Sequence, residues 1–282
     1  MTKILFVYYM EPELQENWND GLKSALSILQ TKSYIKTTYL NLFQRVGGVD
    51  VNDFDFVLAW GGFNSPADQF CLDTKPNSKV PFGLCIGGNA FPVRKDDTYD
   101  VLFYETTWFA PQVKWHPNTH RAFGINSEIF YPHLLSDFSE DTVRESYVLY
   151  DYVSAGSFSK WKRYEKLIDK PGNRMCVGQM QSNNMAESMD IAYKLIANGV
   201  AVSPQVQPWE LALIFNLTDT VYVPASIIGG GERTVWEAMA CGCKVEVEPD
   251  NPKLQSLLEE RVLDEWDYEK QLRKGIESCL KK

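Results

Sequence analysis

A glycine-rich, charged segment in the second half of the chain carries the side chains best suited to chemistry. Residues 229–242 read Gly-Gly-Gly-Glu-Arg-Thr-Val-Trp-Glu-Ala-Met-Ala-Cys-Gly. On a helix, Arg233 and Thr234 would share a face with Glu237, at i−4 and i−3. The first two can contact a diphosphate, and the two oxygens of Glu237 can accept hydrogen bonds from a ribose diol. These residue types and spacings predict a nucleotide site.

The flanking sequence predicts the elements that would position those side chains. The apolar run 220–228 predicts a strand, and the residues after the glycines predict an amphipathic helix that ends near Gly242. Gly230 and Gly231 let the backbone approach a ligand, and the helix start directs N–H groups toward an anion. The alternative interpretation is a capped crossover helix that binds no ligand.

Length and composition bound the kind of protein. The 282 residues suit two domains, each able to bury a core. A net charge of −9 disfavours nonspecific binding to nucleic acid or anionic membranes. No apolar run reaches the length of a membrane span, and no signal-like cleavage site is evident. The six cysteines have neither zinc nor redox spacing, so we expect a cytoplasmic protein with no membrane partner and no metal cluster.

Apolar runs separated by loops and helical segments recur along both halves. The predicted strands are 4–9, 54–60, 80–86, 101–104, 147–155, 175–178, 200–202 and 220–228. Such runs are typical of parallel sheets covered on both faces. We therefore expect an α/β protein with two Rossmann-like lobes and its ligand in the interdomain cleft. The expected divisions are 1–135, 136–265, and a C-terminal helix, 266–282, that packs back on the first lobe.

Three segments, in this order along the chain, resemble one known family. Residues 123–132, Phe-Gly-Ile-Asn-Ser-Glu-Ile-Phe-Tyr-Pro, are similar to the interdomain phrase N-G-V-D-x-x-x-F-x-P of retaining glycosyltransferase family four. Gly156 followed by Lys162 resembles the turn G-R-x-x-x-x-K at the start of its second lobe, and 230–242 resembles its donor segment. The similarity covers most of 120–248. It implies the two-lobed GT-B fold, with an acceptor lobe followed by a nucleotide-sugar lobe. It does not identify the sugar or the acceptor.

The resemblance also implies roles within the donor site. Glu237 would hold the ribose hydroxyls, Lys162 would neutralise the diphosphate leaving group, and the loop 204–209 would border the base. The other implied donor-binding residues are Gly156, Lys160, Arg163, Gly230, Gly231, Arg233 and Thr234. Cations and helix N–H groups can stabilise a departing nucleoside diphosphate without a metal. We therefore expect a nucleotide-sugar donor, with a UDP-sugar favoured, and no required metal.

Two positions depart from the family pattern. Ser157 stands where the family has Arg after the turn glycine, and Gly229 stands where it has a second Glu near the sugar. Glu232 is the nearest acidic residue, so it is the candidate to replace the second Glu near the sugar as a catalytic residue. The chain is also short for the family. These replacements leave open a nucleotide-sugar-binding protein without transferase activity.

A more limited similarity is to the phage enzymes that glucosylate hydroxymethylcytosine in DNA, which also have the GT-B fold. It rests on residues 49–55 and 233–239. The segment 94–121 interleaves basic and aromatic residues that could hold a nucleic-acid strand or a flipped base. The alternative, which we favour for Trp108 and Trp115, is that they belong to the core or a cleft wall.

Two residues at predicted strand ends in the first lobe are further catalytic candidates. Asn89 follows Gly87-Gly88 and could contact the transferred sugar or form a turn. Glu105 follows the strand 101–104 and could be the general base of an inverting reaction or an exposed capping acid. The loop 87–89 carries no carboxylate, and the similarity is to a retaining family, so we expect retention.

The sequence thus predicts a hexosyl- or pentosyltransferase that uses a nucleotide sugar. The expected acceptor is a hydroxyl, specifically one on a hydroxymethylated pyrimidine in phage DNA, which would place the enzyme in the host cytoplasm. The alternatives are an inverting DNA glucosyltransferase, a non-catalytic nucleotide-sugar-binding protein, and a sugar-nucleotide epimerase. A phosphorylase on this fold ranks last, because it would need a pyridoxal lysine and a much longer chain.

Overall fold

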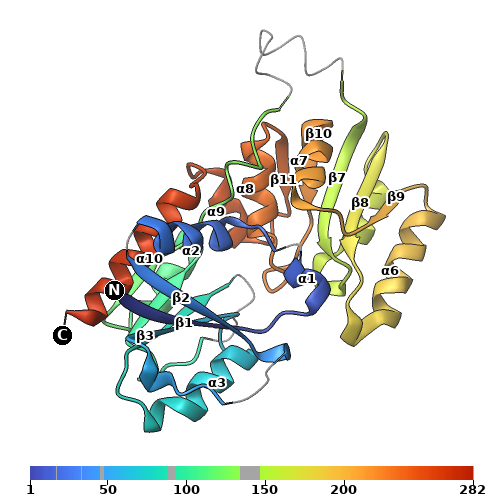
Figure 1. Ribbon diagram of the computed structural model, residues 1–282. Coiled ribbons are helices and arrows are strands. Elements are labelled where there is room, and N and C mark those ends of the chain that lie inside the picture. Colours follow the sequence, from blue (N-terminus) through green and yellow to red (C-terminus); the bar gives the residue numbers. More distant parts are fainter. Residues whose placement is uncertain (17, 33, 45–47, 88–92, 134–146, 282) are drawn as a thin grey trace. The chain divides into compact units, whose positions relative to one another are not determined.

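The computed structural model describes residues 1–16, 18–32, 34–44, 48–87, 93–133 and 147–281 (Figure 1). The chain divides into two compact units. The first contains Met1–Asn126 together with Leu263–Lys282, and the second contains Ser127–Val262. The C-terminal segment therefore belongs to the first unit and is not a separate part.

The first unit is built on a parallel sheet with the strand order β2-β1-β3-β4-β5-β6. Its strands are β1 (Thr2–Tyr8), β2 (Ile35–Asn41), β3 (Phe56–Trp60), β4 (Phe82–Ile86), β5 (Val101–Tyr104) and β6 (Thr119–Arg121). All residues of β4 are buried, as expected for a strand covered on both faces. The edge strand β2 alternates buried and exposed residues in its first half, so it has no continuous apolar run and was not predicted.

Helices cover the first sheet. They are α1 (Pro12–Glu16), α2 (Gly21–Lys32), α3 (Pro66–Thr74), α4 (Ala110–Val113) and α10 (Glu265–Leu280), with 3₁₀ turns η1 (Leu42–Gln44), η2 (Val51–Asp53), η3 (Lys75–Asn77) and η4 (Thr107–Phe109). The Ser65 hydroxyl caps α3 by accepting from Asp68 N–H at 3.1 Å. The C-terminal helix α10 packs against α2 and buries Tyr268, Leu272 and Ile276 in the same core cluster as β1.

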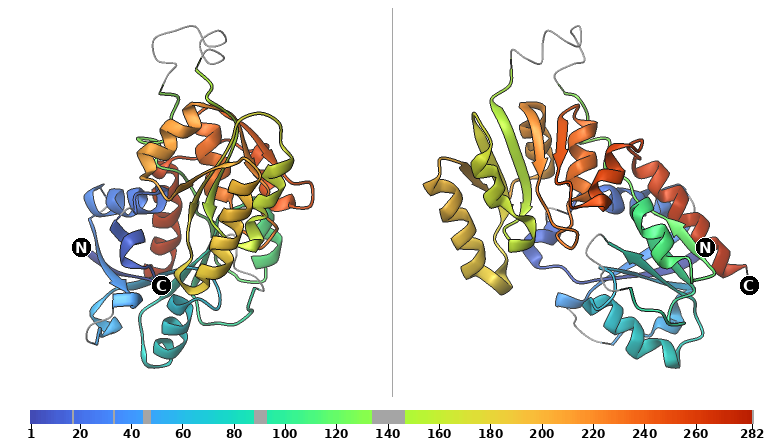
Figure 2. Two further views of the ribbon diagram at one scale, coloured as in Figure 1. Left: turned by 90° about the vertical axis from the view of Figure 1, so that its right-hand side faces the viewer. Right: turned by 180° about the vertical axis from the view of Figure 1, so that it is seen from behind.

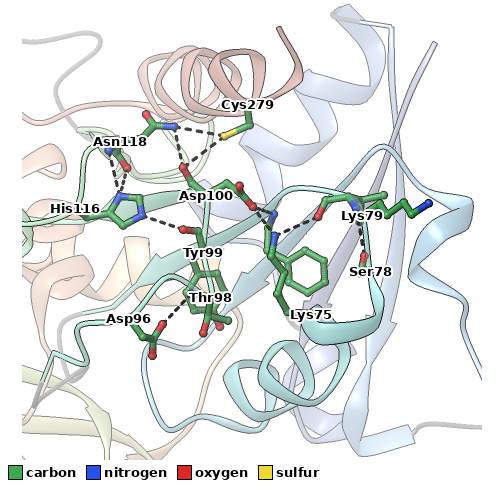
Figure 3. Close-up of polar contacts among 12 residues, drawn as sticks. Lys75, Ser78, Lys79, Asp96, Thr98, Tyr99, Asp100, His116, Asn118 and Cys279 are labelled. Atoms are coloured by element: carbon green, nitrogen blue, oxygen red, sulfur yellow. Dashed lines mark hydrogen bonds and ion pairs between the residues drawn. The ribbon is translucent and has the colours of Figure 1, made fainter. Parts of the chain in front are cut away.

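Polar contacts also fasten α10 to the sheet (Figure 3). The Asn118 side-chain amide donates to the Asp100 carbonyl at 3.0 Å and to the Ser278 hydroxyl at 2.9 Å. The thiol of Cys279 lies 3.7 Å from the same carbonyl. The Asp100 carboxylate pairs with Lys75 at 2.7 Å, so one residue joins the loop before β5 to both α10 and η3.

The second unit has a parallel sheet in the order β11-β10-β7-β8-β9 (Figure 2). Its strands are β7 (Tyr150–Ser157), β8 (Arg174–Gln179), β9 (Ala201–Pro204), β10 (Thr218–Val223) and β11 (Lys244–Val247). Its helices are α6 (Met185–Ala197), α7 (Pro208–Asn216), α8 (Glu232–Ala240) and α9 (Pro252–Leu258), with 3₁₀ turns η5 (Lys160–Lys162), η6 (Tyr164–Asp169) and η7 (Ser182–Asn184). After β7 the chain adds β8 and β9 on one side of that strand, and it then adds β10 and β11 on the other side. A topological switch point therefore lies between β7 and β10, where α/β sheets commonly bind ligands.

Two parallel sheets with covering helices confirm the predicted α/β class with two Rossmann-like units. Most strand ends differ from the predicted ones by a few residues, and two of these differences lie at the candidate site. The strand predicted at 220–228 ends at Val223, because Pro224 offers no N–H to continue the ladder. The strand predicted at 147–155 begins at Tyr150 and continues through Gly156 to Ser157, so Gly156 lies in the last part of a strand and does not begin a turn.

Candidate functional site

Three loops meet at the carboxyl ends of β7, β10 and β11 in the second unit. The loop after β7 carries η5, the loop after β10 carries the glycines, and the loop after β11 leads into α9. The Ser226 N–H donates to the Trp161 carbonyl at 2.8 Å and joins the first loop to the second. The Asn251 side-chain amide donates to the Ala225 carbonyl at 2.8 Å and joins the second to the third.

Arg163 connects the same three loops through its side chain. Its Nε donates to the Pro224 carbonyl at 2.7 Å, and one terminal nitrogen donates to the Ala225 carbonyl at 3.0 Å. Both terminal nitrogens contact the Asp250 carboxylate, at 2.6 and 2.8 Å. The residue has φ of 54°, in the left-handed region. Its guanidinium thus holds the glycine loop in place, whereas the sequence predicted that it would help to neutralise a diphosphate.

The ammonium group of Lys162 lies near two glycines, Gly156 at the end of β7 and Gly230 in the loop after β10. A Cβ built on Gly156 would stand 3.3 Å from Nζ of Lys162, and one built on Gly230 would stand 3.6 Å from it. Although the residue as a whole is half-buried, protein atoms surround the amino group. This burial lowers the pKa of Lys162 to about 8, with further lowering by Lys253 and Arg233 and an opposing effect of Glu232.

Glu232, the first residue of α8, is buried beside this lysine. It is 4% exposed, and one of its oxygens forms an ion pair with Nζ of Lys253 at 2.5 Å. Its other oxygen lies 3.7 Å from the point where a Cβ on Gly230 would stand. Lys253 itself is fully buried. The carboxylate therefore lies between two lysines, an arrangement that the sequence did not predict.

The N-terminus of α8 begins with glycine in the capping position. Gly231 has φ of 113°, which L side chains rarely adopt, and it offers no side chain to cap the helix. The first N–H groups of an α-helix have no partner within the helix. Together with the helix dipole they form an anion-binding end. Within this helix Arg233 is exposed, Thr234 is half-buried and Glu237 is buried.

Tyr164 is a second residue that the sequence analysis missed. It is 2% exposed, and its hydroxyl oxygen has no hydrogen-bond partner among the residues that the structure describes. That oxygen lies 2.8 Å from the point where a Cβ on Gly156 would stand, on the side occupied by Lys162. A tyrosine two residues after a candidate lysine is a weak signal in sequence, because most tyrosines at such positions belong to the core.

The remaining candidates lie in different places. Lys160 is exposed and lies over the ring of Trp161, with 4.8 Å from Nζ to the ring centroid. Asn89 falls outside the described residues. Glu105 is half-buried directly after β5 in the first unit. In the loop predicted to border a base, β9 ends at Pro204 and α7 begins at Pro208.

The segment 94–121 has internal contacts that the DNA-binding hypothesis did not anticipate. Arg94 makes two hydrogen bonds to the fully buried carboxylate of Asp68, at 2.5 and 2.9 Å. Trp108 and Trp115 are half-buried against a core cluster of the first unit. The ring of His116 is buried and bonded to the backbone carbonyl of Tyr99 at 2.9 Å (Figure 3). Most of these side chains therefore stabilise the unit.

Metal-binding clusters and membrane-spanning helices are both absent from the described residues. These residues contain no group of three or more His, Cys, Asp or Glu side chains arranged to hold a metal ion. Of the helices in those ranges, none has both the length and the apolar composition to cross a membrane.

Comparison with solved structures identifies the fold. No protein-family model and no curated protein sequence matches the chain. Anabaena HepE in complex with UDP and glucose is 14% identical with a TM-score of 0.62, covering 99% of this chain and 90% of that one. Sucrose-phosphate synthase from Thermosynechococcus elongatus is 13% identical with a TM-score of 0.59, covering 99% and 95%. UDP-GlcNAc 2-epimerase from Neisseria meningitidis, bound to UDP-GlcNAc, is 12% identical with a TM-score of 0.57, covering 99% and 100%. The chain thus has the two-lobed GT-B fold.

Proposed function

We propose that the protein is a glycosyltransferase whose nucleotide-sugar donor binds at the carboxyl end of the second unit's sheet. The observation that carries this proposal is the convergence of Lys162, the α8 N-terminus and surplus positive charge at the β7–β10 switch point. A diphosphate suits this set, because it is anionic and accepts several hydrogen bonds. Solved structures with this fold hold UDP, UDP-glucose or UDP-GlcNAc, which favours a UDP-sugar.

In the proposed reaction the bond between the anomeric carbon and the phosphate oxygen breaks. The acceptor hydroxyl oxygen bonds to that carbon, and its proton passes to the departing phosphate or to a base. Lys162 and the first amides of α8, including that of Thr234, stabilise the charge that develops on the nucleoside diphosphate. Glu237 accepts from the ribose hydroxyls. Arg163 positions the glycine loop, and exposed Lys160 and Arg233 add positive potential.

A panel of nucleotide sugars tests the donor. Thermal shift and calorimetry should show selective stabilisation by one nucleotide, and mass spectrometry should then find an acceptor whose mass rises by one sugar residue. The acceptor panel should include sugars, lipids and hydroxymethylated DNA. Binding of a nucleotide sugar without hydrolysis or transfer would instead support a non-catalytic binding protein. If the whole panel fails to bind, the proposal is wrong.

We propose retention of the anomeric configuration, on the basis of the similarity to a retaining family. NMR of the anomeric proton in the product measures this directly. An inverted product, together with lost activity in Glu105→Gln, would assign Glu105 as the general base of an inverting enzyme.

The second candidate is a sugar-nucleotide epimerase. One observation favours it: the structurally similar proteins include the Neisseria epimerase and a putative epimerase from Listeria monocytogenes, and the alignment covers 100% of the Neisseria chain. Incubation of UDP-GlcNAc without an acceptor separates the two. An epimerase would yield a second nucleotide sugar, whereas a transferase would release UDP slowly or leave the donor intact.

A further inference from the structure

Beside the proposed donor site lies a buried ion pair that no part of the proposed reaction uses. We infer that Lys253 is a positioning residue of this site, which balances the charge of Glu232 and so leaves the Lys162 ammonium available to an anionic ligand. This inference rests on the proposed function, because it concerns the same phosphate-binding loops.

Burial explains why Glu232 needs a strong partner. A carboxylate that is 4% exposed is costly to bury unless an opposite charge lies beside it. Lys253 pairs with one oxygen at 2.5 Å. The other oxygen lies near Gly230, as Nζ of Lys162 does. Without Lys253, the full charge of Glu232 would act on Lys162 alone. Lys162 would then form an ion pair with Glu232 and would no longer be available to a ligand.

The charge around Lys162 is unbalanced in a way that favours an anion. The titratable groups that act on its ammonium are Glu232, Lys253, Arg233 and Cys176. Of these groups, the two cations Lys253 and Arg233 repel the Lys162 ammonium, and the carboxylate of Glu232 attracts it. Burial is the main cause of the lowered pKa of Lys162, and repulsion by Lys253 and Arg233 lowers it further. A diphosphate bound at the α8 N-terminus would relieve the repulsion, so the surplus contributes to affinity.

The fold fixes Lys253 at this position. The Asn251 side-chain oxygen caps α9 by accepting from the Leu254 N–H at 3.2 Å, while its amide holds the Ala225 carbonyl. Lys253 consequently lies in the first turn of α9, where the helix dipole disfavours a cation. The ion pair with Glu232 on α8 offsets that cost. The position of this lysine is therefore explained by its partner on α8 and not by its own helix.

The test compares Lys253→Met, the double variant Glu232→Gln/Lys253→Met, and Lys244→Met as the control. Lys244 is a lysine of the same unit whose side chain is 77% exposed. Calorimetry with UDP and with inorganic pyrophosphate, across the pH range around 8, measures affinity. Lys253→Met should lose roughly tenfold in affinity, about one charge-assisted hydrogen bond. The pH at which affinity falls should also rise, because Lys162 loses a repulsive neighbour.

The double variant removes one positive and one negative charge, so the surplus returns to that of the wild type. Its affinity should recover to within roughly threefold of the wild type, about 0.6 kcal/mol. A role in packing alone predicts no recovery. If Lys253→Met does not fold, the double variant decides alone: binding near the wild-type level supports the inference, and loss of binding overturns it. Equal affinities of Lys253→Met and Lys244→Met would also overturn it. A wild type that binds pyrophosphate but no nucleotide sugar contradicts only the proposed function.

Discussion

Glu237 is buried on α8, one turn from the helix end that would bind a diphosphate. Glu237→Gln keeps the shape and removes the charge-assisted part of two bonds to the ribose. Each such bond is worth about 1.5–3 kcal/mol, so UDP affinity should fall at least tenfold. Calorimetry with UDP checks this, and ribose-free pyrophosphate is the matched ligand whose affinity should change little. Unchanged UDP binding would remove Glu237 from the site.

Lys162 gives the donor site a predicted pH dependence. A bound diphosphate favours the charged ammonium and raises its pKa above the free value of about 8. Affinity should therefore be greatest below pH 8 and fall as the pH rises above it, with protons taken up on binding near pH 8. Calorimetry in two buffers of different ionisation enthalpy measures this uptake.

Lys162→Ala supplies the control for that titration. The variant should lose the proton uptake, and its turnover should fall more than its donor affinity, because a cation facing the leaving group acts mainly in the transition state. Uptake that persists in this variant would assign the titration to another group.

The Tyr164 hydroxyl is predicted to cost stability in the free protein. It is buried, and it has no hydrogen-bond partner in the described part of the chain. Tyr164→Phe removes it and should raise the free energy of unfolding by about 1 kcal/mol, as measured by urea titration. Tyr193→Phe, at a position that is 62% exposed, should change little. A destabilised Tyr164→Phe would show that the hydroxyl is satisfied in solution.

At the scale of elements, the site depends on how three loops hold one another. In the proposed site the glycine loop after β10 would contact the donor, and its position is set by Arg163, Ser226 and Asn251. A loop fixed from both sides loses little conformational freedom on binding, which favours affinity.

Arg163→Lys tests this arrangement. A lysine cannot reproduce the planar fork that reaches two carbonyls and a carboxylate together. UDP affinity should fall roughly tenfold, about 1.4 kcal/mol, through the displaced loop. Asp250→Asn removes only the partner whose side chain is 62% exposed and should weaken UDP binding much less than Arg163→Lys does. If both variants bind UDP as the wild type does, Arg163 does not position the loop.

At the scale of the whole molecule, the chain leaves the first unit after Asn126 and returns to it at Leu263. The first unit is therefore complete only when α10 has packed against α2 and β5. Its stability depends on contacts between the two ends of the chain, whereas the second unit is one continuous segment.

Leu272→Ala measures that dependence. Leu272 is fully buried in the first core, so the change should cost about 2–5 kcal/mol of unfolding free energy. Leu280→Ala, on the same helix at 37% exposure, should cost far less. Chemical denaturation, followed separately in each unit, should show the loss in the first unit. Equal costs for the two variants would mean that α10 contributes little to that core.

Sequence patterns alone determined the features that depend on neighbouring residues. Continuous apolar runs predicted strands of two parallel sheets, and the glycines before Glu232 predicted a turn into a helix. Both inferences work because burial on two faces and a left-handed backbone leave a local signature. Edge strand β2, exposed in alternation, left a weaker signature and escaped prediction.

Only the tertiary structure determined which charged side chains contact one another. Lys253 and Glu232 begin different helices, and their pairing depends on how α8 and α9 lie after β10 and β11. The family resemblance implied a donor-binding role for Arg163, and the fold directs its guanidinium to the carbonyls of Pro224 and Ala225. For Trp108 and Trp115 the sequence left a stacking surface as the alternative to the favoured core position, and their packing against a core cluster agrees with the favoured interpretation. The physical reason is common to all: spacing fixes which residues share a local face, whereas burial and partners arise between segments that the topology brings together.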